Sequence, residues 1–160
     1  MAVKYQTRFF IIYLGMDIGV SWPIEGTTMA LSYRTKANLN TLMNGSRPAS
    51  IPVGIASEAE NIASYGFSLP DGDRLFALWV DGAAADYDTG ISATLTFPGV
   101  SDNTVTGIDV YEGYEQQLVA SEEDGNLVIR DLLVKDYPII LRLSPTRYVF
   151  LPIVSKAPPR

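Results

Sequence analysis

The chain has 160 residues, of which 47% are hydrophobic and 19% are charged, a composition typical of one globular domain with a sizeable core. It contains no Cys and no His, which excludes disulfides and thiolate chemistry and makes a transition-metal site unexpected. The net charge is −6, and the 12 Lys and Arg residues form no run. Nucleic acid and anionic membrane surfaces are therefore not expected as partners, whereas a neutral polysaccharide or another protein is compatible with this charge.

The N-terminal segment is rich in β-branched and aromatic residues. Residues 8–14 (RFFIIYL) predict a buried strand, and Lys4, Gln6 and Arg8 are expected to face solvent before it. The apolar run from residue 9 to residue 15 is too short to span a bilayer. It is also not followed by a small-residue cleavage site, so any export signal is expected to lie outside this chain.

One helix is predicted, over residues 27–43. Thr27 or Thr28 can cap its start, and Asn44-Gly45 is a typical ending. Apolar and small side chains recur through it at helical spacing, at Leu31, Thr35, Leu39 and Leu42. A connector with two prolines then leads to residue 52.

After residue 52, short β-rich segments alternate with turn signals that contain Gly, Asp or Pro. This pattern predicts a mostly β fold, an antiparallel β-sandwich of about seven to nine strands with one N-terminal α-helix. Residues 1–52 are expected to pack on the sandwich (53–146), and residues 147–160 to form a tail. A last strand at 147–154 would be restricted to an edge by Pro152. The expected strands of the sandwich are 62–69, 74–80, 91–97, 105–111, 115–120, 126–134 and 137–143.

An ordered set of segments resembles a known family. The segments YGFSLPDGDRLFALWVDG, TLTFPG, GIDVYEGYEQQL and LLVKDYPIILRL follow one another between residues 65 and 143. Over residues 28–143 the chain resembles the C-terminal accessory β-sandwich of bacterial TIM-barrel glycoside hydrolases. Residues 8–43 look like the last strand and last helix of the barrel, and the ending FLPIVSK is similar to a tail of some extracellular bacterial proteins.

The resemblance implies a non-catalytic module associated with a carbohydrate-active protein, and an extracellular location. In the barrel enzymes, the two catalytic carboxylates come from the C-terminal ends of barrel strands, which this chain lacks. No catalytic residue is therefore carried over, and the chain is not expected to be an enzyme.

Four residues of one segment, Tyr111, Glu112, Tyr114 and Glu115, are candidates for contact with a ligand. Two carboxylates beside two tyrosines could line a sugar-binding surface, because aromatic rings offer a flat apolar face, or the two carboxylates could act as an acid–base pair. The alternative is an ordinary acidic turn with tyrosines at the rim of the sandwich. Trp22, which precedes a proline in a loop, is a further candidate for an exposed binding ring, for sugar or for a partner.

Closely spaced aspartates suggest a calcium site. Asp81, Asp86 and Asp88 lie in the loop DGAAADYD, and carboxylate oxygens are ligands for Ca²⁺. The alternative is a solvated turn, since the spacing does not fit an EF-hand. Asp71 and Asp73 are interpreted as a hairpin turn, and Trp79 as a core residue. No other cofactor is expected.

A second hypothesis makes the chain a free-standing protein that self-associates. Phe9, Phe10 and Ile12 would form an apolar strand that needs a cover, and a bare edge strand promotes pairing with another chain. The cover would be either the chain's own sandwich or a second copy.

Overall fold

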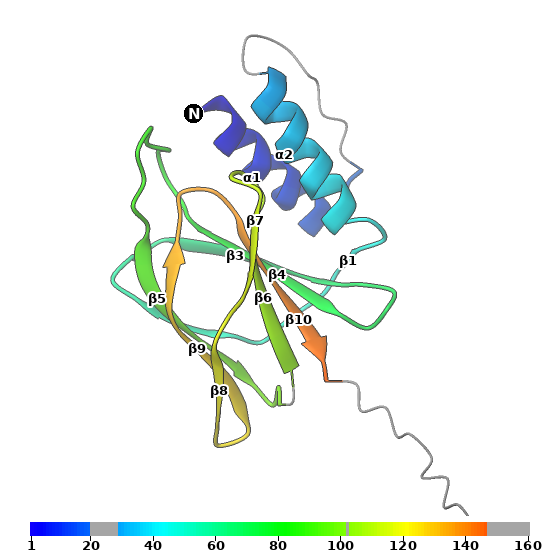
Figure 1. Cartoon of the computed structure of the whole chain (residues 1–160), viewed down its shortest axis with the longest axis vertical. Coiled ribbons are helices and arrows are strands. Elements are labelled where there is room, and N and C mark those ends of the chain that lie inside the picture. The colour runs from blue at the N-terminus through cyan, green and yellow to red at the C-terminus, as the bar shows by residue number, and fades with distance from the viewer. Residues whose placement is uncertain (20–28, 102, 147–160) are drawn as a thin grey trace, which may run out of the picture.

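A computed structural model of the protein describes residues 1–19, 29–101 and 103–146. Within these ranges the chain forms two antiparallel sheets that pack face to face, with two helices on the outer face of one sheet (Figure 1). The predicted antiparallel, mostly β sandwich is therefore confirmed, with ten strands and two helices in the described residues.

The larger sheet has the strand order β1-β3-β4-β10-β6-β7, and the smaller sheet has the order β2-β5-β9-β8. Every strand pair is antiparallel. The bounds of the larger sheet's strands are Arg47–Pro48 (β1), Ile62–Ser68 (β3), Arg74–Val80 (β4), Asn103–Asp109 (β6), Tyr114–Gln117 (β7) and Ile139–Pro145 (β10). Those of the smaller sheet are Gly54–Ser57 (β2), Ile91–Pro98 (β5), Ala120–Glu123 (β8) and Asn126–Val134 (β9).

The central strands of the larger sheet are apolar on both faces. In β4, Phe76 and Leu78 point into the core between the sheets, while Leu75, Ala77 and Trp79 point to the opposite face. All five side chains are buried, which confirms Trp79 as a core residue. A strand that is buried on both faces needs a third layer of structure outside the sandwich.

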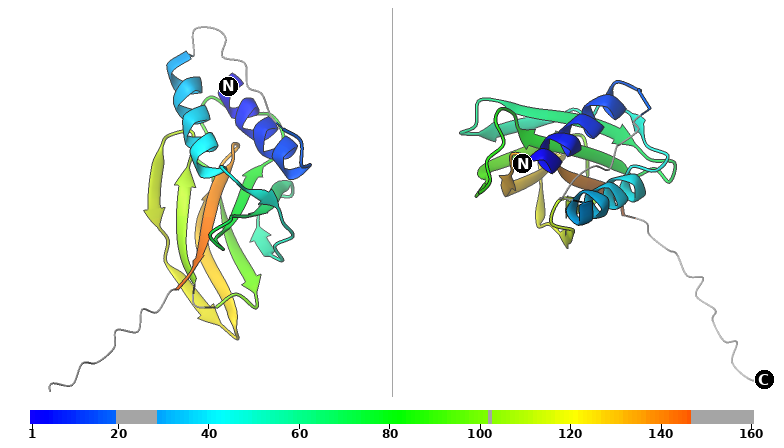
Figure 2. Two further views of the ribbon diagram at one scale, coloured as in Figure 1. Left: turned by 90° about the vertical axis from the view of Figure 1, so that its right-hand side faces the viewer. Right: turned by 90° about the horizontal axis from the view of Figure 1, so that it is seen from above.

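Two helices, α1 (Ala2–Gly15) and α2 (Met29–Leu42), supply this third layer. They lie next to each other on the outer face of the larger sheet (Figure 2). Phe10 and Ile11 of α1 and Leu39 of α2 pack there against Trp79 and the other outward side chains of the sheet. The bounds of α2 agree with the helix predicted over 27–43. Neither helix in the described part of the chain is long and apolar enough to cross a membrane.

The strand predicted over residues 8–14 is wrong, because this segment belongs to helix α1. Its buried side chains recur with helical spacing, at Val3, Lys4, Thr7, Arg8, Phe10 and Ile11. The β-branched and aromatic residues favour a strand locally, but the uncovered apolar face of the sheet decides the outcome. Burial against a partner surface routinely overrides intrinsic propensity.

The expected exposure of Lys4 and Arg8 to solvent is also wrong. Both side chains are buried beneath α1. Their charged ends reach backbone carbonyls and a carboxylate at the end of the sheet, so their polar groups are satisfied. Burial of cations is tolerated only with such partners.

Three short strands do not correspond to any predicted element: β8, which follows the strand predicted over 115–120, and the strands β1 and β2. β1 and β2 lie in the segment rich in Pro, Gly and Ser between α2 and β3, where no alternating pattern marks them. Each pairs with the edge of a different sheet, β1 with β3 and β2 with β5. The strand considered at 147–154 lies outside the described residues.

The neighbouring residues Phe9 and Phe10 provide a test of the helical arrangement. Phe10 is buried against the sheet, whereas Phe9 is 48% exposed. We expect Phe10→Ala to lower the free energy of unfolding by about 3–5 kcal/mol, the usual result of a cavity at a large core side chain. Phe9→Ala should lower it by less than about 1 kcal/mol. Urea denaturation measures both values, and equal losses would contradict the observed packing.

Candidate functional site

The turn between β6 and β7 and the start of β7 carry four of the residues that the sequence analysis selected for ligand contact, Tyr111, Glu112, Tyr114 and Glu115. Asp109 organises this turn, since its Oδ1 accepts hydrogen bonds from the backbone N–H groups of Tyr111 (3.1 Å) and Glu112 (2.9 Å). Gly113 follows with a φ of +80° and donates its N–H to the carbonyl of Asp109. This left-handed conformation favours glycine, which explains the sequence Glu112-Gly113 at this position.

Asp109 also holds the turn against the core. Its Oδ2 accepts a hydrogen bond of 2.8 Å from the hydroxyl of Tyr137. Burial, together with this hydrogen bond, raises the pKa of Tyr137, so the hydroxyl remains a donor at any physiological pH. The rings of Tyr111 and Tyr137 pack together with their centroids 4.9 Å apart, so Tyr111 helps to fix the base of the turn.

A groove of about 540 Å³ runs between α2, the β6–β7 turn and the hairpin turn after β3. We call it the α2 groove. Two hydrogen bonds join α2 to the turn, from the Asn38 amide to the Val110 carbonyl (3.2 Å) and from the Arg34 guanidinium to the Tyr111 carbonyl (3.1 Å). The groove is lined by Asn38, Thr41, Leu42, Asn44, Leu69, Pro70, Asp71, Ile108, Asp109, Val110, Gly113, Tyr114, Glu115 and Arg142.

One arginine holds the hairpin side of the α2 groove in place. Arg142 of β10 donates from Nε to Asp73 (2.5 Å) and from a terminal nitrogen to Asp71 (3.0 Å). The hydrogen bond to Asp73 raises the pKa of Arg142, and Asp73 also accepts a hydrogen bond from Ser144. Because Asp71, Asp109 and Glu115 also line the groove, carboxylates outnumber the single guanidinium there.

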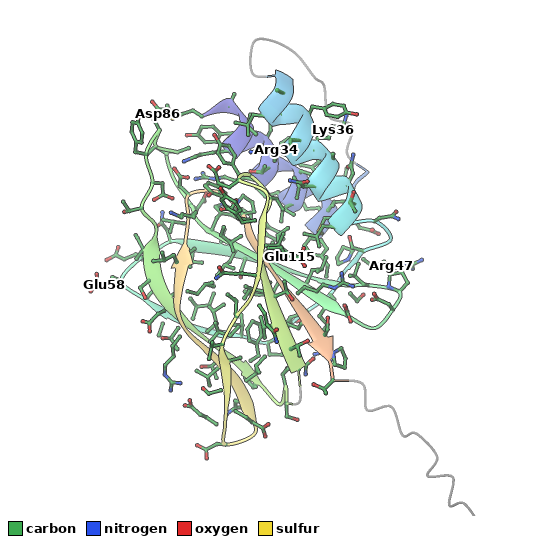
Figure 3. All side chains as sticks on the ribbon, viewed as in Figure 1. Arg34, Lys36, Arg47, Glu58, Asp86 and Glu115 are labelled. Carbon is green, nitrogen blue, oxygen red and sulfur yellow. The ribbon has the colours of Figure 1, made fainter. Side chains whose placement is uncertain are left out.

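The structure brings two of the predicted ligand-contact residues to this groove. Tyr114 and Glu115 line it, and the Tyr114 side chain is 71% exposed. Figure 3 shows Glu115 on β7, beneath the end of α2. Tyr111 is half-buried beneath the turn and Glu112 is exposed beside it, and neither is part of the groove lining. Trp22 lies outside the described residues.

Sequence reasoning missed the other walls of the groove, although one signal for them exists. Arg142 is the only charged residue in the apolar strand YPIILRL, and a charge in such a strand requires a partner. Asp71 and Asp73 lie in the hairpin turn, as the sequence predicted. They are also the partners of Arg142. No local signal indicates that Asn38 bonds a turn about 70 residues later in the chain.

The three aspartates proposed for calcium have separate surroundings. Asp88 accepts hydrogen bonds from the N–H groups of Gly90 (2.9 Å) and Asp136 (2.6 Å), Asp81 lies 3.6 Å from the Arg8 guanidinium, and Asp86 is exposed. In the part of the chain that the structure describes, no three carboxylates gather in a group that could hold a metal ion.

The pKa of Asp88 is lowered. Burial, the largest influence, raises it, but the two backbone hydrogen bonds and the charges of Lys135 and Lys4 outweigh burial. The carboxylate therefore stays charged and fixes the loop to the connection that follows β9.

The loop with these aspartates is fixed instead by the first turns of α1. The Lys4 ammonium lies 2.7 Å from both the Asp136 carboxylate and the Ala85 carbonyl, and the Arg8 guanidinium donates to the carbonyls of Asp136, Gly82 and Val80. The other carboxylate oxygen of Asp136 accepts the Ala85 N–H. We call these interactions the α1 anchor, and its groups are satisfied by one another rather than directed at a ligand.

Comparison with known proteins does not identify the chain. It matches no protein-family model, and no curated protein is similar to it in sequence. The resemblance to accessory sandwiches of glycoside hydrolases therefore stays a prediction.

The α1 anchor predicts a large effect of one substitution. Lys4→Met removes the partner of a buried carboxylate, and we expect a loss of about 3 kcal/mol in the free energy of unfolding. The matched change Arg47→Met, at an exposed cation of β1, should lower it by less than about 1 kcal/mol. Thermal and urea denaturation of both variants measure the difference, and a stable Lys4→Met variant would show that the anchor contributes little.

Proposed function

We propose that the protein is a non-catalytic binding module whose α2 groove holds a neutral glycan. The observation that supports this best is the exposed ring of Tyr114 beside a polar groove. An aromatic ring can stack on the apolar face of a sugar, while amide, hydroxyl and carboxylate groups can bond its hydroxyls. A volume of about 540 Å³ is within the range of small-ligand sites.

The charges of the groove favour a neutral ligand over an acidic one. Three carboxylates face one guanidinium, which is itself bound to Asp71 and Asp73. An acidic sugar would meet repulsion here, and the net charge of −6 on the whole chain adds to that repulsion. A neutral glycan meets hydrogen-bonding groups without this penalty.

A binding role without catalysis agrees with the residues of the groove. Asp109 is engaged by the backbone of its own turn and by Tyr137, and Asp71 by Arg142. Hydrolysis of a glycoside requires an acid and a second carboxylate on opposite sides of one bond. Glu115 lies in the groove, but Glu112, its expected companion, does not line it. The resemblance to accessory sandwiches supports the same proposal, as a module attached to or associated with a carbohydrate-active protein.

Replacement of Tyr114 tests this function. We expect Tyr114→Ala to weaken binding to a neutral oligosaccharide about tenfold, which corresponds to about 1.4 kcal/mol of lost stacking. The side chain is exposed, so the melting temperature should not change. Tyr87→Ala is the matched control, since Tyr87 is 97% exposed and lies in the loop before β5, away from the groove. A glycan array followed by titration calorimetry makes the measurement. Absence of binding to every neutral glycan would overturn the proposal, as would equal binding by both variants.

Self-association is a second candidate, favoured by the outer side of α1. Met1, Tyr5, Phe9 and Met16 are exposed there, and the rings of Phe9 and Tyr13 pack with their centroids 4.0 Å apart. Because Lys4 and Arg8 are buried, this side of α1 carries no charged side chain between residues 1 and 16. Of the three residues that the sequence suggested for this role, Phe9 is exposed, Ile12 is partly buried and Phe10 is buried inside the protein.

The oligomeric state of one variant tests the second candidate. If copies associate through α1, Phe9→Asp should convert a larger species to a folded monomer, because a charge is placed in an apolar contact. Light scattering coupled to size-exclusion chromatography measures the mass, with Tyr33→Asp on α2 as the control at another exposed aromatic residue. A wild-type protein that is monomeric at high concentration would exclude this candidate.

A further inference from the structure

A second groove, of about 420 Å³, lies on the other side of strand β7. We call it the β9 groove. It opens where the edge of the larger sheet faces the smaller sheet, and Gln116 and Leu118 form one wall while Arg130, Asp131 and Lys135 form the other. Its polar side chains are Asp109, Gln116, Arg130, Asp131 and Lys135. Arg130 is paired with Glu123, and Lys135 donates to the carbonyl of Asp88, so the Gln116 amide and the Asp131 carboxylate are the groups best placed to bond hydroxyl groups.

The two grooves meet at the start of β7 and the end of β6. Tyr114 lines both the α2 groove and the β9 groove, and so do its neighbours Ile108 and Asp109 on β6. β7 is one of the two edge strands of the larger sheet, and all four of its residues are exposed. The side chains after Tyr114 divide between the grooves, with Glu115 in the α2 groove and Gln116 in the β9 groove.

The far wall of the β9 groove contains a distortion of β9. Arg130 and Asp131 together oppose the single residue Thr94 of β5, which makes this a β-bulge. Asp131 has a φ of +55°, a conformation that L-residues other than Asn and Asp rarely adopt. Bulges redirect side chains and are common beside binding sites, and here both bulge residues line the groove.

We infer that the protein binds a glycan chain rather than a single sugar or a disaccharide, and that this chain crosses β7 at Tyr114 with units in both grooves. The inference rests on the proposed glycan-binding function and extends it to the length of the ligand. Ligand pockets in proteins have volumes from about 300 Å³ upward, and each groove is larger than this. Each groove can therefore hold part of the glycan. The second set of contacts is made intramolecularly once the first groove is occupied, which raises the affinity for a longer ligand.

Oligosaccharides of increasing length test this inference. The probes are the neutral β-1,4-linked glucose, xylose and mannose series from dimer to hexamer, titrated into the full chain by calorimetry. We expect the hexamer of the preferred series to bind more than about tenfold more tightly than its dimer, because two grooves are then occupied by one molecule. A gain of this size exceeds the several-fold gain that a longer chain obtains by offering more registers to one groove.

Two matched pairs of variants separate the grooves. Gln116→Ala should remove most of the length advantage and leave the affinity for the dimer unchanged, while Gln117→Ala, on the neighbouring residue that lines neither groove, should change nothing. Glu115→Gln should weaken the binding of dimer and hexamer alike. Glu58→Gln is its control, because Glu58 follows β2 at the edge of the smaller sheet and lines neither groove.

The outcomes distinguish this inference from the function on which it rests. Equal affinity of wild-type protein for dimer and hexamer, with binding still weakened by Tyr114→Ala, would overturn the inference and leave the α2 groove as the binding site. Identical behaviour of Gln116→Ala and Gln117→Ala would likewise overturn it. Absence of binding to all three series and to the neutral glycan array would overturn both the inference and the proposed function.

Discussion

The apolar outer face of the larger sheet is the constraint on which the remaining structure depends. β4 and β10 are buried on both sides, so a two-layer sandwich alone would expose Leu75, Trp79 and Ile140 to water. Full burial of one such side chain contributes roughly 1.5–3 kcal/mol, which is a large share of the stability of a domain. The helices are therefore an integral layer of this domain, and the residues that attach them are as important as the sandwich core.

The attachment of α1 determines what the helix shows to solvent. Lys4 and Arg8 turn inward to the end of the sheet, where they bond the carbonyls and the carboxylate of the loops that follow β4 and β9. A helix whose cations are used in this way has only neutral side chains left for its outer side. The exposed aromatic residues of α1 are thus a direct consequence of the buried polar contacts beneath it.

The sequence was sufficient to predict what depends on local pattern. The alternation of apolar and polar residues, together with the turn residues, predicted the positions of β3 to β6, β9 and β10 closely. Each of these strands is bounded by Gly, Asp or Pro, and each buries one or both of its faces. α1 could not be predicted in this way, since RFFIIYL has strand propensity and only the sheet that it covers makes it a helix. The i, i+4 spacing of Lys4 and Arg8 was the available signal of a shared helical face, but the groups that bind these cations lie about 75 to 130 residues further along the chain. The same holds for the α2 groove, whose walls come from α2, a hairpin turn and the β6–β7 turn.

The position of the grooves separates binding from stability. Tyr114, Glu115 and Gln116 are exposed and lie on an edge strand, so their side chains contribute little to the core and can be changed without loss of the fold. Their backbone, in contrast, is fixed by Asp109, Gly113 and the hydrogen bonds between α2 and the turn, which hold Tyr114 between the two grooves. An edge strand also offers unpaired backbone groups that invite pairing with another chain, and β7 limits this by being only four residues long and by carrying Glu115. The same features that keep this edge from pairing with another sheet leave its side chains available to a ligand that approaches from either face.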